Sequence, residues 1–230
     1  VMTYKHNESP AKGSRPMSAS ASGFVPGSGA GALLLEELES ARARGAFIYA
    51  EILGGHMTSG GQRNGGTMTA PNSQAVQRCI SLAVKDAGIR TSEIDTINGH
   101  LTATIKDPME IKNWKTALGL SKNDFPAINS LKGMTGHCLA AAGSIECVAS
   151  VLQIAHGFIF PSTNCEDLHP DIEEQIGKLA IPHKSRSQEV NTVIKASFGF
   201  GDVNACIIFK KFTNCIVNFV IWLIVFTRFV

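Results

Sequence analysis

The segment KGMTGHCLAAAGSIECVASVLQI, residues 132–154, decides the fold because it joins a glycine-containing loop to an unusually apolar helix. From His137 onward its only charged side chain is that of Glu146, and most of the other residues are apolar or small. A helix that is apolar all round is buried on nearly every face. We therefore expect residues 137–154 to form a helix in the middle of an α/β fold.

Alternating strand and helix patterns flank this segment on both sides. The expected elements are a helix within residues 34–44 closed by Gly45, a strand at 47–52, a long adaptable loop at 54–71, helices at 72–87 and 107–118, strands at 94–98 and 125–129, and a closing hairpin of 190–196 with 204–209. Asn72 is a favoured N-cap, Pro108 suits a first helical turn, and Gly88 can end a helix. Such alternation is typical of α/β folds.

Composition divides the chain into three parts. Residues 1–23 are rich in Ser, Ala, Gly, Lys and Pro, and we interpret them as a connecting segment from a truncated N-terminal half, entered midway. Residues 24–212 carry the strand and helix patterns. Residues 213–230 form an apolar tail that includes Asn214 and Asn218. This tail falls short of a bilayer span and is better explained as a non-native extension, with a membrane helix as the less favoured alternative.

The charge balance and the cysteines exclude several classes of protein. The 21 basic and 19 acidic residues leave a net charge of +2, which does not indicate nucleic acid or an anionic membrane as the main partner. The six cysteines show no Cys-x-x-Cys spacing, so neither a zinc site nor a redox pair is predicted. We expect reduced thiols and a cytoplasmic protein.

Two histidines are the main candidates for catalysis. His100 lies in NGHLTAT, residues 98–104, after a strand-like run, and His137 closes KGMTGH before the apolar helix. The positive end of a helix dipole favours a neutral imidazole, which can donate a hydrogen bond to a carbonyl that is becoming an enolate. The pair would then stabilise a charge that appears only in the transition state. A structural role for either ring alone is the alternative.

Lys132 and Glu146 are candidates for a supporting role. The Lys132 ammonium could orient His137 or a carboxylate, or could simply be solvated in its loop. Glu146 stands nine residues after His137, and at about 100° per residue it lies on the opposite helix face, so it cannot contact that histidine directly. A carboxylate in so apolar a helix needs a partner, either Lys132 or a backbone amide, and a buried structural ion pair is equally consistent.

Taken together, these stretches resemble the C-terminal half of the β-ketoacyl-acyl carrier protein synthases, which are condensing enzymes of the thiolase-like superfamily. The matching stretches, within residues 14–211, are SRP at 14–16, GFVPGSGAG at 23–31, NGHLTAT at 98–104, KGMTGH at 132–137, Glu146, and the Gly-Phe-Gly turn ending at Asn204-Ala205. The resemblance implies a thiolase-like α/β fold, of which this chain is the C-terminal half of a five-layered α-β-α-β-α architecture, with a mixed sheet and a buried central helix.

The resemblance also implies roles for individual residues. His100 and His137 would promote decarboxylation of malonyl-carrier protein and hold the thioester oxygen, with Lys132 and Glu146 in support. The implied substrate-binding residues are the pantetheine-contacting Thr102 and Thr104, the gating Phe200, and Thr69 on a loop near that gate. The alternative for all of these positions is turn formation and core packing.

Partners and cofactors follow from the same resemblance. It implies an acyl carrier protein, malonyl and acyl thioesters, and a homodimer in the intact enzyme. A nucleic-acid partner is not expected from the charge balance, and a membrane partner is not favoured. No metal or redox cofactor is required, because phosphopantetheine arrives on the carrier-protein substrate.

The family's nucleophile is a cysteine in an Asp-Thr-Ala-Cys-like elbow, which lies upstream of the part present here, and none of the six cysteines matches it. Cys138 follows His137 but is better explained by packing. We therefore expect the isolated chain to be inactive. Leu101 and Asp202 stand where the family usually has glycine, so the pantetheine channel could be narrower and the gate stiffer.

Two other functions remain open at this stage. The chain could belong to a non-catalytic partner subunit, such as a chain-length factor, although retention of both histidines and Lys132 argues against this. A thiolase-type acyltransferase that uses coenzyme A is less favoured, because the sequence lacks the Cys-x-Gly setting of its late cysteine base.

Overall fold

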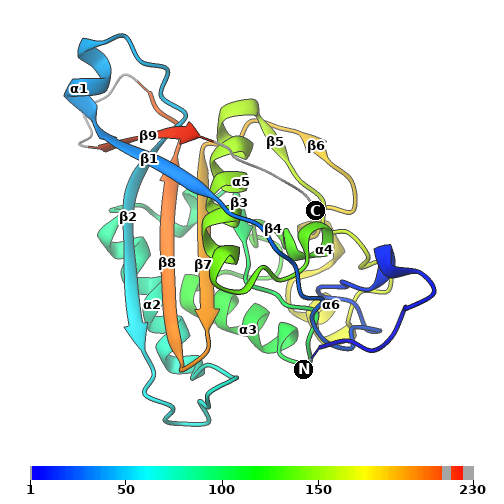
Figure 1. The fold of residues 1–230 in the computed structure, drawn as a ribbon. Coiled ribbons are helices and arrows are strands. Elements are labelled where there is room, and N and C mark those ends of the chain that lie inside the picture. The colour runs from blue at the N-terminus through cyan, green and yellow to red at the C-terminus, as the bar shows by residue number, and fades with distance from the viewer. Residues whose placement is uncertain (1, 214–218, 225–230) are drawn as a thin grey trace.

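The computed structural model describes residues 2–213 and 219–224, and Figure 1 shows their arrangement. The helices are α1 (Leu38–Ala43), α2 (Ser73–Asp86), α3 (Asp107–Leu118), α4 (Lys132–Thr135), α5 (Ala142–His156) and α6 (Pro170–Ile176). The strands are β1 (Ala32–Glu37), β2 (Ala50–Ser59), β3 (Thr96–Asn98), β4 (Ala127–Asn129), β5 (Phe158–Ile159), β6 (Arg186–Ser187), β7 (Thr192–Gly199), β8 (Val203–Lys210) and β9 (Phe219–Ile224).

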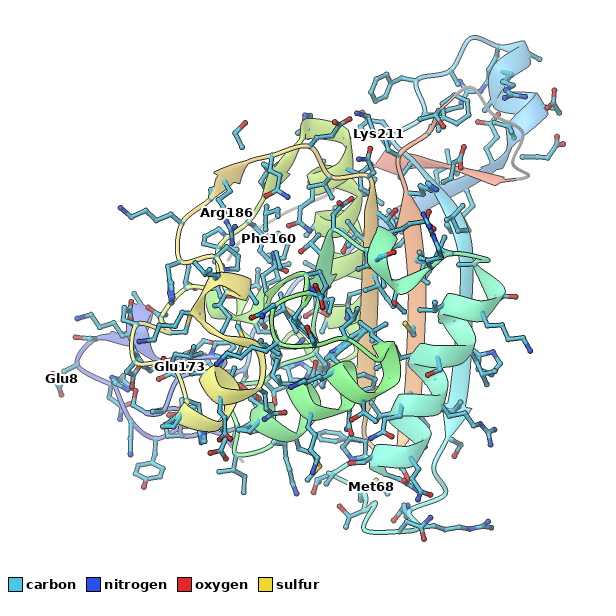
Figure 2. The ribbon with its side chains drawn as sticks, turned by 180° about the vertical axis from the view of Figure 1, so that it is seen from behind. Glu8, Met68, Phe160, Glu173, Arg186 and Lys211 are labelled. Carbon is cyan, nitrogen blue, oxygen red and sulfur yellow. The ribbon has the colours of Figure 1, made fainter. Side chains whose placement is uncertain are left out.

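One mixed sheet organises these elements. Its strand order is β1-β9-β2-β8-β7-β3-β4. β3 runs parallel to both β4 and β7, whereas β7, β8 and β2 are successively antiparallel. α5 packs on one face of the sheet against β7, and α2 packs on the other against β2 and β8 (Figure 1). Seen from behind, α2, α3 and α6 cover that second face, with Met68 on the loop beyond the end of β2 (Figure 2).

The hydrophobic core between the sheet and α2 and α3 follows from the sequence pattern. Asn72 caps α2 by accepting hydrogen bonds from the backbone of Gln74 and Ala75, as expected for an N-cap. The helix predicted at 107–118 has the same bounds as α3, and its fully buried Trp114 belongs to the same core cluster as Ile97 of β3. The predicted hairpin at the C-terminal end is also confirmed, as β7 and β8.

Two predictions about the N-terminal third were wrong. Of the helix predicted within residues 34–44, only Leu38–Ala43 is helical, as α1, and residues 34–37 belong to strand β1 because they pair with β9. Residues 54–59 belong to β2 rather than to a loop. Gly54 and Gly55 are needed for close packing, since a Cβ on Gly54 would lie 2.6 Å from the Ala87 nitrogen and one on Gly55 2.8 Å from the Cys206 oxygen.

The apolar segment folds largely as expected. α5 begins at Ala142, after a 3-10 turn at Leu139–Ala141, so His137 precedes the helix by several residues and does not open it. Within α5 only His156 is exposed. The stretch Leu139–His156 is long and apolar enough to cross a bilayer by length and composition alone, but it packs against β7 and β1 as a core helix does.

The apolar tail is only partly described. Residues 219–224 form β9, a strand between β1 and β2. The remaining tail positions, 214–218 and 225–230, lie outside the described residues. The alternatives of a membrane helix and a non-native extension depend on these positions as well.

We expect Ile97→Ala to lower the free energy of unfolding by about 2–5 kcal/mol, because it opens a cavity beneath a fully buried strand. Urea denaturation of the chain measures this loss. Ile105→Ala removes the same atoms from a side chain that is 87% exposed and should leave the free energy nearly unchanged. Equal losses in the two variants would contradict the assignment of Ile97 to the core.

Candidate active site

The candidate site lies where two neighbouring parallel strands end. Asn98 of β3 pairs with Asn129 of β4, His100 follows β3, and Lys132 follows β4. In open α/β sheets, substrates are handled outside the carboxyl ends of such strands. The topology therefore brings together two loops that are about 30 residues apart in the sequence.

Two carboxylates of α3 hold the loop that carries His100. Glu110 accepts hydrogen bonds from the backbone nitrogens of His100 (2.7 Å) and Leu101 (2.8 Å). Asp107 accepts from those of Thr102 (3.0 Å), Ala103 (3.1 Å) and Thr104 (3.3 Å). The sequence analysis missed both acids. Their spacing of three residues at the start of a helix, directly after the loop, was the available signal.

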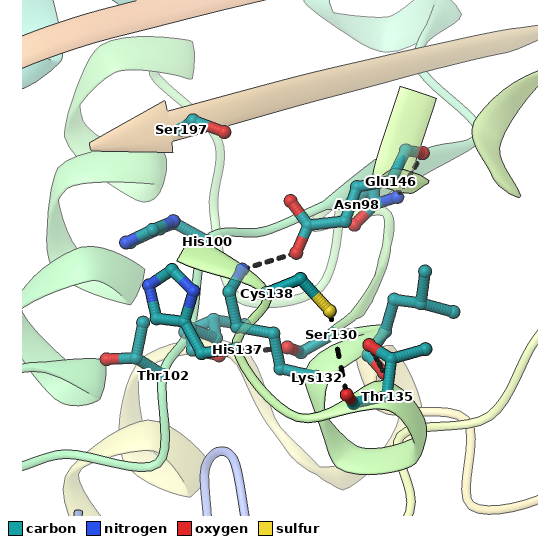
Figure 3. Close-up of polar contacts among 12 residues, drawn as sticks. Asn98, His100, Thr102, Ser130, Lys132, Thr135, His137, Cys138, Glu146 and Ser197 are labelled. Carbon is teal, nitrogen blue, oxygen red and sulfur yellow. Dashed lines mark hydrogen bonds and ion pairs between the residues drawn. The ribbon is translucent and has the colours of Figure 1, made fainter. Parts of the chain in front are cut away.

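The two imidazoles lie side by side (Figure 3). Their ring centroids are 5.3 Å apart and their planes are nearly perpendicular, at 84°. His137 Nδ1 accepts a hydrogen bond from the Leu139 nitrogen at 3.1 Å, so the neutral ring carries its proton on Nε2. The Nδ1 atom of His100 is buried without a hydrogen-bond partner. The rings therefore keep hydrogen-bonding capacity that the protein itself does not use.

Both rings are held in their neutral form. Burial, followed by the positive charges of Lys132 and Lys195, lowers the pKa of His137 to about 4. The same causes, together with His137, place the pKa of His100 well below its usual range. The neutral state was predicted, but from a helix dipole at His137. Because α5 begins only at Ala142, burial and nearby ammonium groups are the cause instead.

Glu146 forms an ion pair with Lys132 (Figure 3). Of the two predicted partners of this carboxylate, Lys132 or a backbone amide, the structure shows the lysine. Its other carboxylate oxygen forms an ion pair with Lys195 Nζ at 2.8 Å. Burial opposes the charge of Glu146, but Lys195 and Lys132 outweigh it and lower the pKa of the carboxyl. Lys195 was missed by the sequence analysis, although a single lysine within the apolar strand pattern at 190–196 was a signal.

A cavity of about 280 Å³ opens onto the two histidines. The predicted substrate-binding residues Thr69, Thr102, Thr104 and Phe200 all line it, as do His100 and His137. Phe200 sits at the β7–β8 turn and is 62% exposed, and the backbone nitrogen of Gly201 donates to the Met68 oxygen. The structure thus gathers these predicted residues around one cavity, with Lys132 and Glu146 close behind the rings.

Cys138 points away from this cavity. Its Sγ lies 3.8 Å from the Thr135 carbonyl oxygen, on the far side from the rings (Figure 3). Burial and the charge of Glu146 raise the pKa of its thiol. Both observations agree with the interpretation of Cys138 as a packing residue. Within residues 2–213 and 219–224, no group of three metal-ligating side chains is gathered at one point.

Glu110 should make stability depend on pH. Burial, and after it the charge of Asp107, raises the pKa of the Glu110 carboxyl to about 7. In the unfolded chain the pKa of a glutamate is about 4.3. The folded chain binds the extra proton at Glu110, so the contribution of this group to stability falls as the pH rises from about 4.5 to 7, by up to about 3 kcal/mol. The neutral His100 and His137 contribute with the opposite sign, so the effect of Glu110 is measured as a difference between variants. Glu110→Gln should remove this contribution, so that stability rises more steeply with pH, or falls less steeply, than in the unmodified chain.

Urea denaturation at several pH values between 5 and 8 measures the effect. Glu174→Gln, at an exposed carboxylate of α6, is the control and should retain the slope of the unmodified chain. An unchanged slope in Glu110→Gln would show that the carboxyl is ionised throughout this range.

Comparison with known proteins agrees with this geometry. Residues 49–166, more than half of the chain, match the family described as the C-terminal domain of β-ketoacyl synthases. The chain is 39% identical over 216 residues to 3-oxoacyl-acyl-carrier-protein synthase 2 of Rhizobium meliloti (strain 1021), covering 93% of this chain and 49% of that protein. It is 41% identical over 212 residues to synthase 1 of Escherichia coli (strain K12), covering 92% and 49%. The chain thus spans about half the length of the curated relatives that it matches.

Solved structures give the same result. The ishigamide ketosynthase/chain length factor superposes with a TM-score of 0.78 at 35% identity, over 87% of this chain and 47% of that one. A type II polyketide synthase ketosynthase, bound to the hexaketide and in complex with its acyl-carrier protein, superposes with a TM-score of 0.78 at 31% identity, over 93% and 50%. The fold is therefore thiolase-like, and the chain belongs to the β-ketoacyl synthase family, in which it corresponds to the C-terminal domain.

Proposed function

We propose that this chain is the histidine-bearing half of a β-ketoacyl-acyl carrier protein synthase, which condenses an acyl thioester with malonyl-carrier protein in fatty acid or related biosynthesis. The observation that carries the proposal is the pair of neutral imidazoles, 5.3 Å apart, at one cavity. The relatives named 3-oxoacyl-acyl-carrier-protein synthases support it.

The chemistry requires a site that stabilises an enolate. When the malonyl thioester loses CO₂, the electron pair of the broken C–C bond moves into the thioester enolate, whose oxygen becomes negative. The Nε2–H of His137 and a ring N–H of His100 would donate hydrogen bonds to that oxygen. The enolate carbon then attacks the carbonyl of the acyl group held on cysteine. The thiolate leaves, and a β-ketoacyl thioester forms.

The rings suit this task because they are uncharged at neutral pH. A neutral imidazole donates a hydrogen bond to the developing oxyanion without first giving up a proton. Thr102 and Thr104, whose hydroxyl oxygens lie 3.2 Å apart on the cavity wall, would contact the pantetheine arm, and Phe200 with Thr69 would gate the acyl pocket. The phosphopantetheine arrives on the acyl carrier protein, so the proposal includes no resident cofactor.

The nucleophile is proposed to lie outside this chain. In each of the five cysteines that the structure describes, the thiol pKa is raised, first of all by burial, which is the opposite of what a catalytic thiolate needs. Cys215 lies outside the described residues. A homodimer and a cytoplasmic location complete the proposal.

A non-catalytic chain-length-factor role remains the second candidate, because one of the similar structures is titled as a ketosynthase/chain length factor. The specific observation against it is that His100 and His137 both line the cavity, with Lys132 buried behind them. A subunit that only shapes the chamber needs no second hydrogen-bond donor.

In the full-length protein, His137→Ala and His100→Ala should each reduce release of CO₂ from malonyl-carrier protein by roughly 100- to 1,000-fold, because each removes an oxyanion donor. CO₂ release without an acyl acceptor isolates this step. His156→Ala, on an exposed side chain at the end of α5, should leave the rate unchanged. A full-length protein that releases no CO₂ before any substitution would favour the chain-length-factor role.

The isolated 230-residue chain should not be acylated by an acyl thioester. Mass spectrometry after incubation with acyl-carrier protein measures this. Stoichiometric acylation of one cysteine would place the nucleophile within this chain and refute that part of the proposal.

A further inference from the structure

Lys195 is a buried lysine for which the proposed mechanism has no use. It lies on β7 and is 2% exposed, and its Nζ is 2.8 Å from Glu146 Oε2 and 3.0 Å from Ser197 Oγ. Lys132, equally buried, binds the other oxygen of Glu146. One carboxylate is therefore held between two ammonium groups that come from different elements, β7 and α4.

The charges in this cluster do not cancel. Two ammonium groups and one carboxylate leave one positive charge in excess, and among the described residues no other carboxylate forms an ion pair with either lysine. Burying an unbalanced charge is costly, and a well-packed apolar residue would normally be better tolerated at a central strand position. A cost of this kind is characteristic of functional sites.

The neighbouring groups do not supply the missing negative charge by direct contact. From α3, Glu110 faces Lys132, but both of its oxygens accept backbone N–H groups, and Asp107 is bound in the same way. Cys147 of α5 and Cys206 of β8 face Lys195 as uncharged thiols, because burial raises the pKa of each. Among the described residues, the rings of His100 and His137 also lie close enough to sense these charges, and His56 of β2 lines a cavity together with Lys195.

We propose that Lys195 is a positioning residue for the histidine pair, an inference that rests on the proposed condensing function. With Lys132 it holds both oxygens of Glu146, so that the carboxylate cannot turn towards the rings, and it keeps one positive charge in excess beside them. That charge disfavours protonation of either imidazole, and it is complementary to the enolate that the rings would stabilise. Lys195 contacts no substrate; it acts through Glu146 and the electrostatic potential at the rings.

The test is the titration of His137 in the 230-residue chain, labelled with ¹³C at histidine Cε1 and followed by NMR. Lys195→Met removes the charge at similar volume, and Lys195→Gln also removes it but keeps a donor for Glu146. In both variants the midpoint of His137 should move upward by roughly one pH unit, because a like charge has gone and Glu146 is less compensated. His137→Gln assigns the resonance.

Two controls separate charge from structure. Ser197→Ala removes a hydrogen-bond partner of the same ammonium without changing any charge and should leave the midpoint in place. Lys178→Met removes an exposed lysine that pairs with Glu173 on the surface and should do the same. If the midpoints in Lys195→Met and Lys195→Gln coincide with that of the unmodified chain, Lys195 is structural only and the inference is overturned.

The titration needs no turnover, so its result does not depend on the condensing activity. A shifted midpoint in a protein that releases no CO₂ from malonyl-carrier protein would leave the electrostatic role intact and refute the proposed function. In an active full-length enzyme, Lys195→Met should also raise the lower pH limit of decarboxylation, since the rings would become protonated at a higher pH.

Discussion

The buried carboxylate of Glu146 is the interaction on which the site depends. It lies on α5, its two oxygens are bound by Lys132 after β4 and by Lys195 on β7, and all three side chains are almost fully buried. The central helix, the end of one parallel strand and the closing hairpin are therefore joined at one point. Removing Glu146 would leave both ammonium groups uncompensated in the core, which costs several kcal/mol, about 3–5 for a broken buried pair.

A second set of carboxylates holds the other half of the site. Asp107 and Glu110, at the start of α3, bind the consecutive backbone N–H groups of the loop from His100 to Thr104. Ala103 adopts a positive φ of 60° in this loop, a conformation that needs such support. The loop is thus held by backbone hydrogen bonds to α3 as well as by burial of Leu101 in the core. This explains how a short polar stretch can place an imidazole at the cavity.

The electrostatics of the site follow from these two arrangements together. Burial and the lysines disfavour protonated imidazole, so both rings face the cavity as neutral groups with donors or acceptors to spare. Asp202 constrains one rim of the cavity. Its buried carboxylate accepts the backbone N–H groups of Gln62 and Asn72, and so ties the loop that bears Thr69 to the turn that bears Phe200.

The sequence by itself determined the local features of this protein. The helices at 73–86 and 107–118 could be predicted from Asn72, Pro108 and the glycines that end them, because capping depends on neighbours within one turn. The resemblance of the histidine loops to a known family supplied the candidate residues. The number of residues between His100 and His137 does not indicate how far apart their rings lie in space. Only the pairing of β3 with β4 brings the two rings together.

What the tertiary structure alone decided depends on contacts between distant segments. Strand β1 and the second part of β2, residues 54–59, were misassigned because their partners, β9 and β8, lie about 150 residues or more further along the chain. The glycines that mark close packing in β2 also resemble those of a loop. In the sequence Lys195 is one residue of an expected strand. Only the fold brings it into an ion pair with Glu146, which lies 49 residues earlier in the sequence. Pairing of strands and burial of charge are properties of the assembled core, because neither exists until the chain has brought the partners together.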